Sequence, residues 1–135
     1  MKAARLLAVF LLTLATFLAV DFFWLGVVAR GLYTRELGHL LAPSVRWGAA
    51  ALFYVLYVAG LLALVVLPNR RGRWLRVVDR GALLGLVAYA TYDLTNLATL
   101  PEWPLLVTVV DLAWGAVVTG VSAGAAWWFA RRLLP

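Results

Sequence analysis

Four long apolar stretches dominate this chain, and each has the length that a helix needs to cross a lipid bilayer. They cover residues 6–28, 47–67, 81–100 and 105–129. About 20 mainly apolar residues span the hydrocarbon core as a helix. Because that core offers no water to the backbone, each stretch should be helical. The sequence therefore predicts an all-α integral membrane protein, a bundle of four transmembrane helices in one domain over residues 1–135.

The composition agrees with lipid as the solvent for most of the chain. Of the 135 residues, 65% are hydrophobic and 13% charged, and the mean hydropathy is +0.94. Soluble domains have roughly 45–50% apolar residues and about a quarter charged ones. The chain has no cysteine and a single histidine, His39. Disulfides, thiolate ligands and histidine-rich metal sites are therefore excluded.

The connections between the stretches differ in character. Residues 30–46 carry apolar side chains at helical spacing, which predicts a short amphipathic helix at the membrane interface, ending near Pro43. These apolar positions are Tyr33, Leu37, Leu40 and Leu41. A basic loop over residues 69–80 joins the second and third stretches, and a tight turn over residues 101–104 joins the third and fourth.

Basic residues predict the orientation. With the N-terminus in the cytoplasm, nine of the twelve lie on the cytoplasmic side: Lys2, Arg5, Arg70, Arg71, Arg73, Arg76, Arg80, Arg131 and Arg132. The other three are Arg30, Arg35 and Arg46. Cytoplasmic loops carry such an excess. We therefore expect both termini in the cytoplasm. Topology also explains the net charge of +6, so we expect no nucleic-acid partner.

Three acidic residues interrupt the apolar stretches: Asp21, Asp93 and Asp111. Each costs roughly 2.5–3.5 kcal/mol at the centre of a membrane helix, so such residues usually face the bundle interior and often serve a function. Counted from the outer ends of their stretches, all three lie about 10 Å below the outer boundary. Tyr54 reaches a similar depth. The polar groups should therefore meet in one layer, in the outer half of the bundle.

The helix faces agree with this layer. Four polar residues of the third stretch, at positions i, i+3, i+4 and i+7, form one stripe: Tyr89, Tyr92, Asp93 and Asn96. We predict a polar pocket in which the acids titrate or coordinate, amide and hydroxyl groups orient a ligand, and tryptophans form the walls. Its candidate residues are Asp21, Asp93, Asp111, Asn96, Tyr54, Tyr57, Tyr89, Tyr92, Trp24 and Trp114.

No basic residue lies at the depth of the three acids. Carboxylates in a low dielectric repel one another, so one or more should be protonated or neutralised by a bound cation. If that cation is a metal, Asp21, Asp93 and Asp111 are its candidate ligands, and oxygen ligands suit magnesium, calcium or manganese. The structural alternative is that the same groups only form hydrogen bonds between helices.

Two further patterns involve packing. Asp21 to Trp24 and Asp111 to Trp114 share the spacing D-x-x-W on helices that run in opposite directions. This is either chance, a shared packing role, or an inverted pseudo-symmetric site of the kind that transporters use. A ridge of small residues on the fourth stretch predicts close helix packing, including dimerisation as a hypothesis. The ridge is Ala116, Gly120 and Gly124.

Several segments together resemble a known family of small bacterial membrane proteins, domain of unknown function 2177. The residues that carry the resemblance are 21–26 (DFFWLG), 53–57 (FYVLY), 89–96 (YATYDLTN) and 111–115 (DLAWG). They extend over nearly the whole chain. The resemblance implies a four-helix membrane protein of a bacterial cell, which we expect in the inner (cytoplasmic) membrane. It supplies no activity, substrate or catalytic residue.

We interpret the chain as a membrane protein whose pocket binds or translocates a proton, a cation or a small amphipathic molecule. Two alternatives stay open: an intramembrane enzyme acting on a lipid or isoprenoid substrate, and a structural or accessory subunit whose acids specify helix pairing. The expected partners are the bilayer, a lipid or amphipathic ligand and, as a hypothesis, further copies of the chain. No catalytic residue and no cofactor is indicated.

Overall fold

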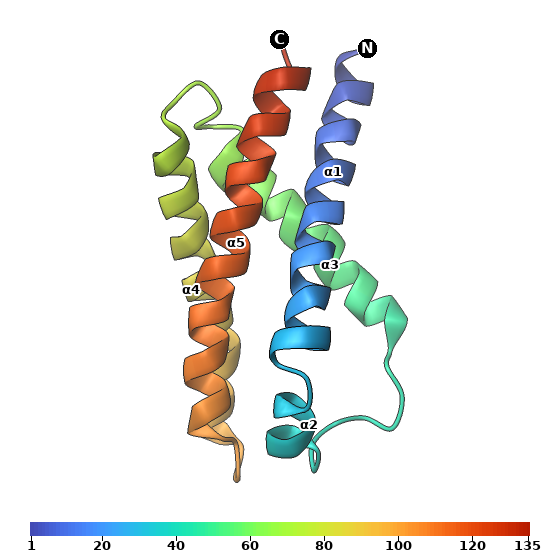
Figure 1. Cartoon of the computed structure of the whole chain (residues 1–135), viewed down its shortest axis with the longest axis vertical. Helices are drawn as coiled ribbons and strands as arrows, with labels where there is room; N and C mark the ends of the chain where they lie inside the picture. The colour runs from blue at the N-terminus through green and yellow to red at the C-terminus, as the bar shows by residue number, and fades with distance from the viewer.

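The chain forms helices joined by short connections, and it has no strand. The computed structural model describes all residues, 1–135 (Figure 1). The helices are α1 (Lys2–Phe23), α2 (Leu32–Leu37), α3 (Trp47–Leu61), α4 (Trp74–Thr99) and α5 (Leu105–Leu133). Two π-helical segments extend α1 and α3: η1 (Trp24–Val28) and η2 (Leu62–Val66). The predicted all-helical class is therefore confirmed.

Three of these helical segments are long and apolar enough to cross a membrane. They are Lys2–Val28, Trp47–Val66 and Leu105–Leu133. Although α4 is 26 residues long, it is not among them. It is the least apolar of the four long helices, because it contains four charged residues as well as several tyrosines and threonines. The charged residues are Arg76, Asp79, Arg80 and Asp93. The fourth crossing therefore stays a prediction.

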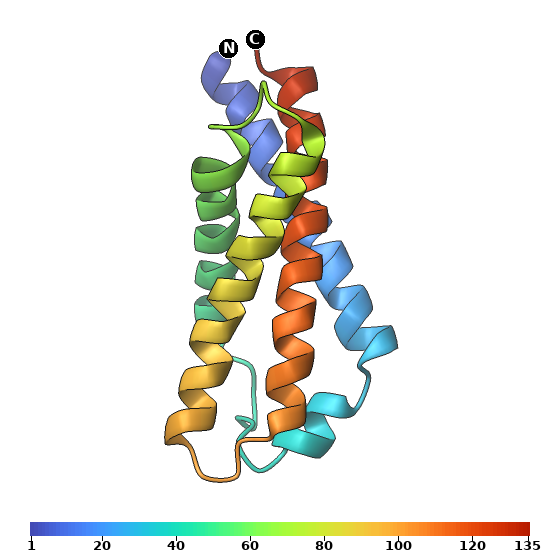
Figure 2. The same cartoon turned by 90° about the vertical axis from the view of Figure 1, so that its left-hand side faces the viewer.

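The two chain termini lie at the same end of the bundle, beside the loop that joins η2 to α4. Figures 1 and 2 show α2 and the turn between α4 and α5 at the opposite end. It follows that α1 and α4 run away from the terminal end, whereas α3 and α5 run back toward it. α4 and α5 extend over most of the bundle, whereas α3 begins short of the end that carries α2 (Figures 1 and 2).

The third helix begins earlier than the sequence predicts. We expected a loop over residues 69–80, yet α4 already begins at Trp74, after an extended residue at Arg73. Hydropathy marks where a helix meets hydrocarbon and not where its hydrogen bonds begin. Charged residues such as Arg76 and Arg80 continue a helix as readily as apolar ones. The loop prediction is therefore wrong beyond residue 73.

The core runs along the face of α1 that meets α5. Buried residues recur at every fourth position of α1: Val9, Thr13, Phe17 and Asp21. The hydroxyl of Thr13 donates a hydrogen bond of 2.7 Å to the carbonyl oxygen of Val9, so this polar side chain is satisfied within its own helix. The stripe ends at Asp21, which brings that carboxyl between the helices rather than toward lipid.

α4 and α5 make the most extensive contact in the bundle, and glycines allow it. A Cβ atom added at Gly85 would lie 1.9 Å from the carbonyl oxygen of Gly115. The two backbones therefore touch at this crossing, as small residues permit in membrane helices. The predicted small-residue ridge also faces α4, since an added Cβ at Gly120 would lie 3.3 Å from Ala82 Cβ. Close packing within one chain accounts for the ridge.

The connection between the first two spans folds against the end of the bundle opposite the termini (Figure 1). Gly31, at φ +84°, turns the chain into α2 through a conformation that other residues rarely adopt. Leu37 then packs with Trp103 and Val107 in a small separate cluster. The predicted short helix therefore exists, but it ends at Leu37, and Leu40 and Leu41 lie exposed outside it. Its place at a membrane interface stays a prediction.

Replacing Gly85 with alanine should destabilise the bundle, because the added methyl group would push α4 away from α5. Overpacking of a tight contact typically costs about 1–3 kcal/mol. The matched control is Gly60→Ala in α3, where an added Cβ meets nothing within 4 Å. Thermal unfolding of the purified protein in detergent should show a lower Tm for Gly85→Ala only. Equal Tm values for the two variants would contradict this packing.

Candidate functional site

The two D-x-x-W motifs lie against each other where α1 meets α5. The indole rings of Trp24 and Trp114 are stacked, with centroids 4.4 Å apart and an interplanar angle of 8°. Trp24 stands at the first residue of η1, where the helix widens into a π-helical turn. Such turns are rare and occur frequently at functional sites. The stack marks the centre of a polar network.

Asp21 is fully satisfied by donors from two other helices. Tyr54 of α3 donates a 2.8 Å hydrogen bond to Asp21 Oδ2, and Trp114 of α5 donates a 3.1 Å hydrogen bond to Asp21 Oδ1. The residue is only 8% exposed. Both of its oxygens therefore have a donor, and this acid joins α1, α3 and α5.

Asp111 takes its donor from outside the long helices. The hydroxyl of Tyr33, in α2, donates a 2.6 Å hydrogen bond to Asp111 Oδ1 and itself accepts one of 3.0 Å from Trp24 Nε1. Burial, together with the bond to Asp111, raises the pKa of the Tyr33 hydroxyl above its ordinary value. Tyr33 therefore remains a donor at neutral pH.

The two motifs thus satisfy each other crosswise. Trp114 of one motif bonds Asp21 of the other directly, and Trp24 reaches Asp111 through the hydroxyl of Tyr33. Because α1 and α5 run in opposite directions, the two motifs are inverted relative to each other. The relation is not exact, because the hydroxyl of Tyr33 stands between Trp24 and Asp111. Of the alternatives for the repeated spacing, a shared packing role is the one that these contacts favour.

Asp93 differs from the other two acids. It is completely buried, and neither carboxyl oxygen has a hydrogen-bond donor. The neighbouring acid is Asp111, on α5, and the two carboxyl groups would repel each other if both were ionised. We call Asp93 and Asp111 the acid pair.

A pocket of about 510 Å³ lies beside this acid pair, between α3 and α4. Five of its six lining residues are apolar or aromatic, and the sixth is Asp111; the set is Phe53, Tyr57, Ala88, Tyr89, Tyr92 and Asp111. Tyr57 is held in place by a 2.8 Å hydrogen bond with Thr119 and by the ring of Tyr89, 6.4 Å away between centroids. The pocket therefore combines aromatic walls with one carboxyl group.

The predicted site residues fall into two adjoining groups. The hydrogen-bond network holds Asp21, Asp111, Tyr54, Trp24 and Trp114. The acid pair and the pocket hold Asp93, Tyr57, Tyr89 and Tyr92, with Asp111 common to both. Tyr92 lies at the pocket edge, 59% exposed, with its ring edge-on to Trp103. Asn96 is half-buried, one turn beyond Tyr92, and does not line the pocket.

The three acids are not gathered as ligands of one metal ion. No group of three or more His, Cys, Asp or Glu side chains lies close enough together to hold one. Asp21 directs both of its oxygens to Tyr54 and Trp114 instead. What the geometry offers is a carboxyl pair rather than a metal centre.

Tyr33 is the residue of the network that our site prediction missed. It lies in the connection between two spans, where we expected only an amphipathic helix at the membrane surface. A polar hydroxyl within an otherwise apolar pattern is the signal that could have drawn attention to it. Its partner could not be found from spacing, because the path of residues 29–46 decides which carboxyl it reaches.

Comparison with protein families identifies a family that the chain matches. The family model described as "Predicted membrane protein (DUF2177)" matches residues 6–128. The chain belongs to this family. Membership in DUF2177 confirms the resemblance seen in the sequence and the assignment as a membrane protein. The DUF2177 description names no activity, and no curated protein and no solved structure matches the chain.

Removing the hydroxyl of Tyr33 or Tyr54 should destabilise the DUF2177 bundle, because each leaves a buried carboxylate oxygen without its donor. Hydrogen bonds between membrane helices contribute about 0.6 kcal/mol, and up to about 2 kcal/mol. Tyr33→Phe and Tyr54→Phe should both lower the Tm in detergent. Tyr89→Phe is the control, because no hydrogen bond holds its hydroxyl. A Tm loss for Tyr89→Phe as large as for the other two would refute the network.

Proposed function

We propose that this protein crosses the membrane four times and binds a small amphipathic cation in the pocket between α3 and α4. The observation that carries this proposal is the meeting of aromatic walls and the Asp111 carboxyl in one pocket of about 510 Å³. Small-molecule sites typically have about 300–1,000 Å³, mainly apolar walls and a few polar groups. The ligand's charge lies at Asp111 and its apolar body lies among the rings.

The direction of the helices supports four crossings. The candidate spans α3 and α5 run the same way, so α4 must carry the chain back across the same thickness (Figures 1 and 2). At 1.5 Å per residue its 26 residues measure about 39 Å, which exceeds the roughly 30 Å of the hydrocarbon core. Its most costly group, Asp93, is completely buried in the bundle.

Charge supports cytoplasmic termini. The nine basic residues on the predicted cytoplasmic side belong to the end that carries the termini and the loop between η2 and α4. The other three, Arg30, Arg35 and Arg46, lie in the connection at the opposite end. An excess of Lys and Arg in short loops is typical of the cytoplasmic side. We therefore propose the inner membrane of a bacterial cell, with both termini in the cytoplasm and the pocket nearer the outer face.

Single cysteines will test this topology, since the chain has none of its own. Ser44→Cys and Pro101→Cys should react with a membrane-impermeant maleimide added to intact spheroplasts. Arg73→Cys should react only after the membrane is opened. Labelling of Pro101→Cys and Arg73→Cys from the same side would show that α4 does not cross.

The lining of the pocket suits a cation with an apolar body. A cation over the face of a tyrosine or phenylalanine is attracted by the ring, by about 0.5–1 kcal/mol at exposed sites and about 2 kcal/mol or more when desolvated. Phe53 and Tyr92 are both exposed at the pocket edge, on α3 and α4. The ligand therefore enters sideways from the lipid. The carboxyl of Asp111 adds the only charge of the lining.

The acid pair links this binding to a proton. With the pocket empty, one proton lies between Asp93 and Asp111. A cation at Asp111 supplies the positive charge that the proton supplied before, so the proton leaves as the cation enters. The pocket thus exchanges one proton for one cation. A proton-coupled carrier uses the same kind of exchange.

Asp21 has a packing role. For this residue a specific observation supports the alternative that the acids only specify helix pairing. Both oxygens of Asp21 accept hydrogen bonds from other helices, and neither is left for a ligand. The structure adds no such observation for an enzyme acting on lipid or isoprenoid. The acids therefore divide between a packing role and a binding role.

Calorimetry with tetraphenylphosphonium tests the proposal on the purified protein in detergent. Asp111→Asn should weaken binding about tenfold or more, which corresponds to about 1.4 kcal/mol, because it removes the only charge in the lining. The control is Asp79→Asn, the same charge change at an exposed position of α4. Uncharged triphenylphosphine oxide should bind wild type and Asp111→Asn alike.

Repeating the titration in buffers of different ionisation enthalpy measures the proton. Wild type should release about one proton per bound cation, and Asp93→Asn should release none. If tetraphenylphosphonium binds Asp111→Asn as well as wild type, the site is not at Asp111 and the proposal fails. Binding without proton release in wild type would contradict the proposed exchange of a proton for the cation.

A further inference from the structure

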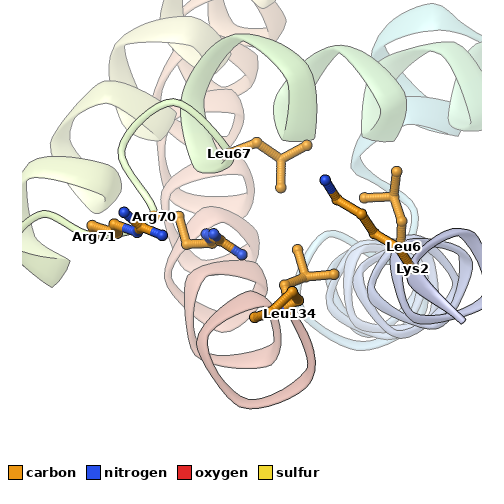
Figure 3. Close-up of a pocket in the computed structure, with 7 residues that line it drawn as sticks. Lys2, Leu6, Leu67, Arg70, Arg71 and Leu134 are labelled. Atoms are coloured by element: carbon orange, nitrogen blue, oxygen red, sulfur yellow. The ribbon is translucent and has the colours of Figure 1, made fainter.

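A second hollow lies at the opposite end of the bundle, beside the termini. It has a volume of about 480 Å³, and basic and apolar side chains share its lining. Figure 3 shows the ammonium group of Lys2 and the guanidinium group of Arg70 extending toward the same space, with Arg71 beside Arg70 and farther from that space. Leu6, Leu67, Leu134 and Pro135 line the rest of the hollow. The hollow joins residues from α1, the loop after η2 and the end of α5.

The cations at this hollow have no partner within the chain. The only ion pair of the protein joins Arg35 and Glu36, at the other end of the bundle. Two further arginines of the terminal end lie over tryptophan rings instead: Arg131 is 4.8 Å from the centroid of Trp127, and Arg132 is 4.6 Å from that of Trp128. Basic groups gathered at one exposed site attract an anion from outside, with a strength that salt reduces.

An apolar groove continues from the hollow along the bundle. It has about 440 Å³, lies between α1 and the end of α3 with η2, and is lined by apolar residues only: Ala3, Leu6, Leu7, Phe10, Ala59, Leu62, Ala63 and Leu67. Leu6 and Leu67 line both the groove and the hollow, so the two spaces adjoin. From Ala3 to Phe10 the groove follows α1 for about 10 Å.

We infer that this end of the protein binds an anionic phospholipid of the surrounding leaflet. Its phosphate lies among Lys2, Arg70 and Arg71, and the first part of one acyl chain lies in the groove beside Phe10. Charge complementarity selects an anionic headgroup, because basic pockets between helices attract such lipids. The adjoining groove selects a lipid over a free anion, because only a lipid fills both spaces. This site is separate from the pocket between α3 and α4 and does not depend on its function.

Native mass spectrometry of the purified protein in detergent tests the site directly. Dioleoyl phosphatidylglycerol should bind in preference to dioleoyl phosphatidylcholine. The double variant Arg70→Gln/Arg71→Gln should weaken phosphatidylglycerol binding by roughly 25-fold, because each basic residue contributes about fivefold. The matched control, Arg73→Gln/Arg76→Gln, removes the same charge from exposed residues of the same end that do not line the hollow. It should bind the lipid nearly as well as wild type.

A groove variant keeps the test decisive if the arginine variant does not fold. Ala59→Phe fills the groove from an exposed position of α3 and should weaken phosphatidylglycerol binding without touching a charge. Equal binding of the two lipids, or equal losses in both arginine variants, would overturn the inference. So would unchanged binding in Ala59→Phe. Displacement of the lipid by millimolar inorganic phosphate would show a site for free phosphate and would overturn the lipid assignment.

Discussion

The crossed pairing of two aspartates and two tryptophans between α1 and α5 is the interaction on which the rest of the bundle depends. Inside a bilayer a polar group finds partners within the protein or goes without. Trp114 bonds Asp21, Trp24 reaches Asp111 through Tyr33, and the two indoles stack 4.4 Å apart. These contacts fix how α1 is rotated against α5, and they draw α2 into the same layer.

The way donors are distributed gives the three acids different chemistry. Asp21 has two donors, Asp111 has one, and Asp93 has none. A group whose oxygens are all occupied stabilises the fold. A group with a free oxygen next to a pocket is available to a proton or a ligand. We therefore propose that Asp93 and Asp111, between α4 and α5 and beside the pocket, carry the chemistry of the protein. The hydrogen bonds of Asp21, between α1 and α5, contribute to its stability.

Sequence patterns predicted the helices well and their pairings poorly, for a physical reason. Hydropathy reports the length of chain in hydrocarbon, so it located the spans, and the helical rise placed the three acids in one layer. Hydrogen-bond partners depend on how each helix is rotated, which for α4 and α5 is decided by the backbone contact of Gly85 with Gly115. They also depend on the path of the connection before α3, which alone brings Tyr33 to Asp111. The sequence therefore led to a shared site of three equivalent acids, and the structure separates them.

We propose that one proton lies between Asp93 and Asp111, whereas Asp21 has a packing role. Infrared spectroscopy of the purified protein at neutral pH detects a protonated carboxyl group directly, through its carbonyl stretching band. We expect one such band in wild type, its loss in Asp93→Asn, and no change in Asp21→Asn. The absence of the band in wild type would contradict the shared proton. Its loss in Asp21→Asn would show that the proton lies on Asp21 instead, which would also contradict it.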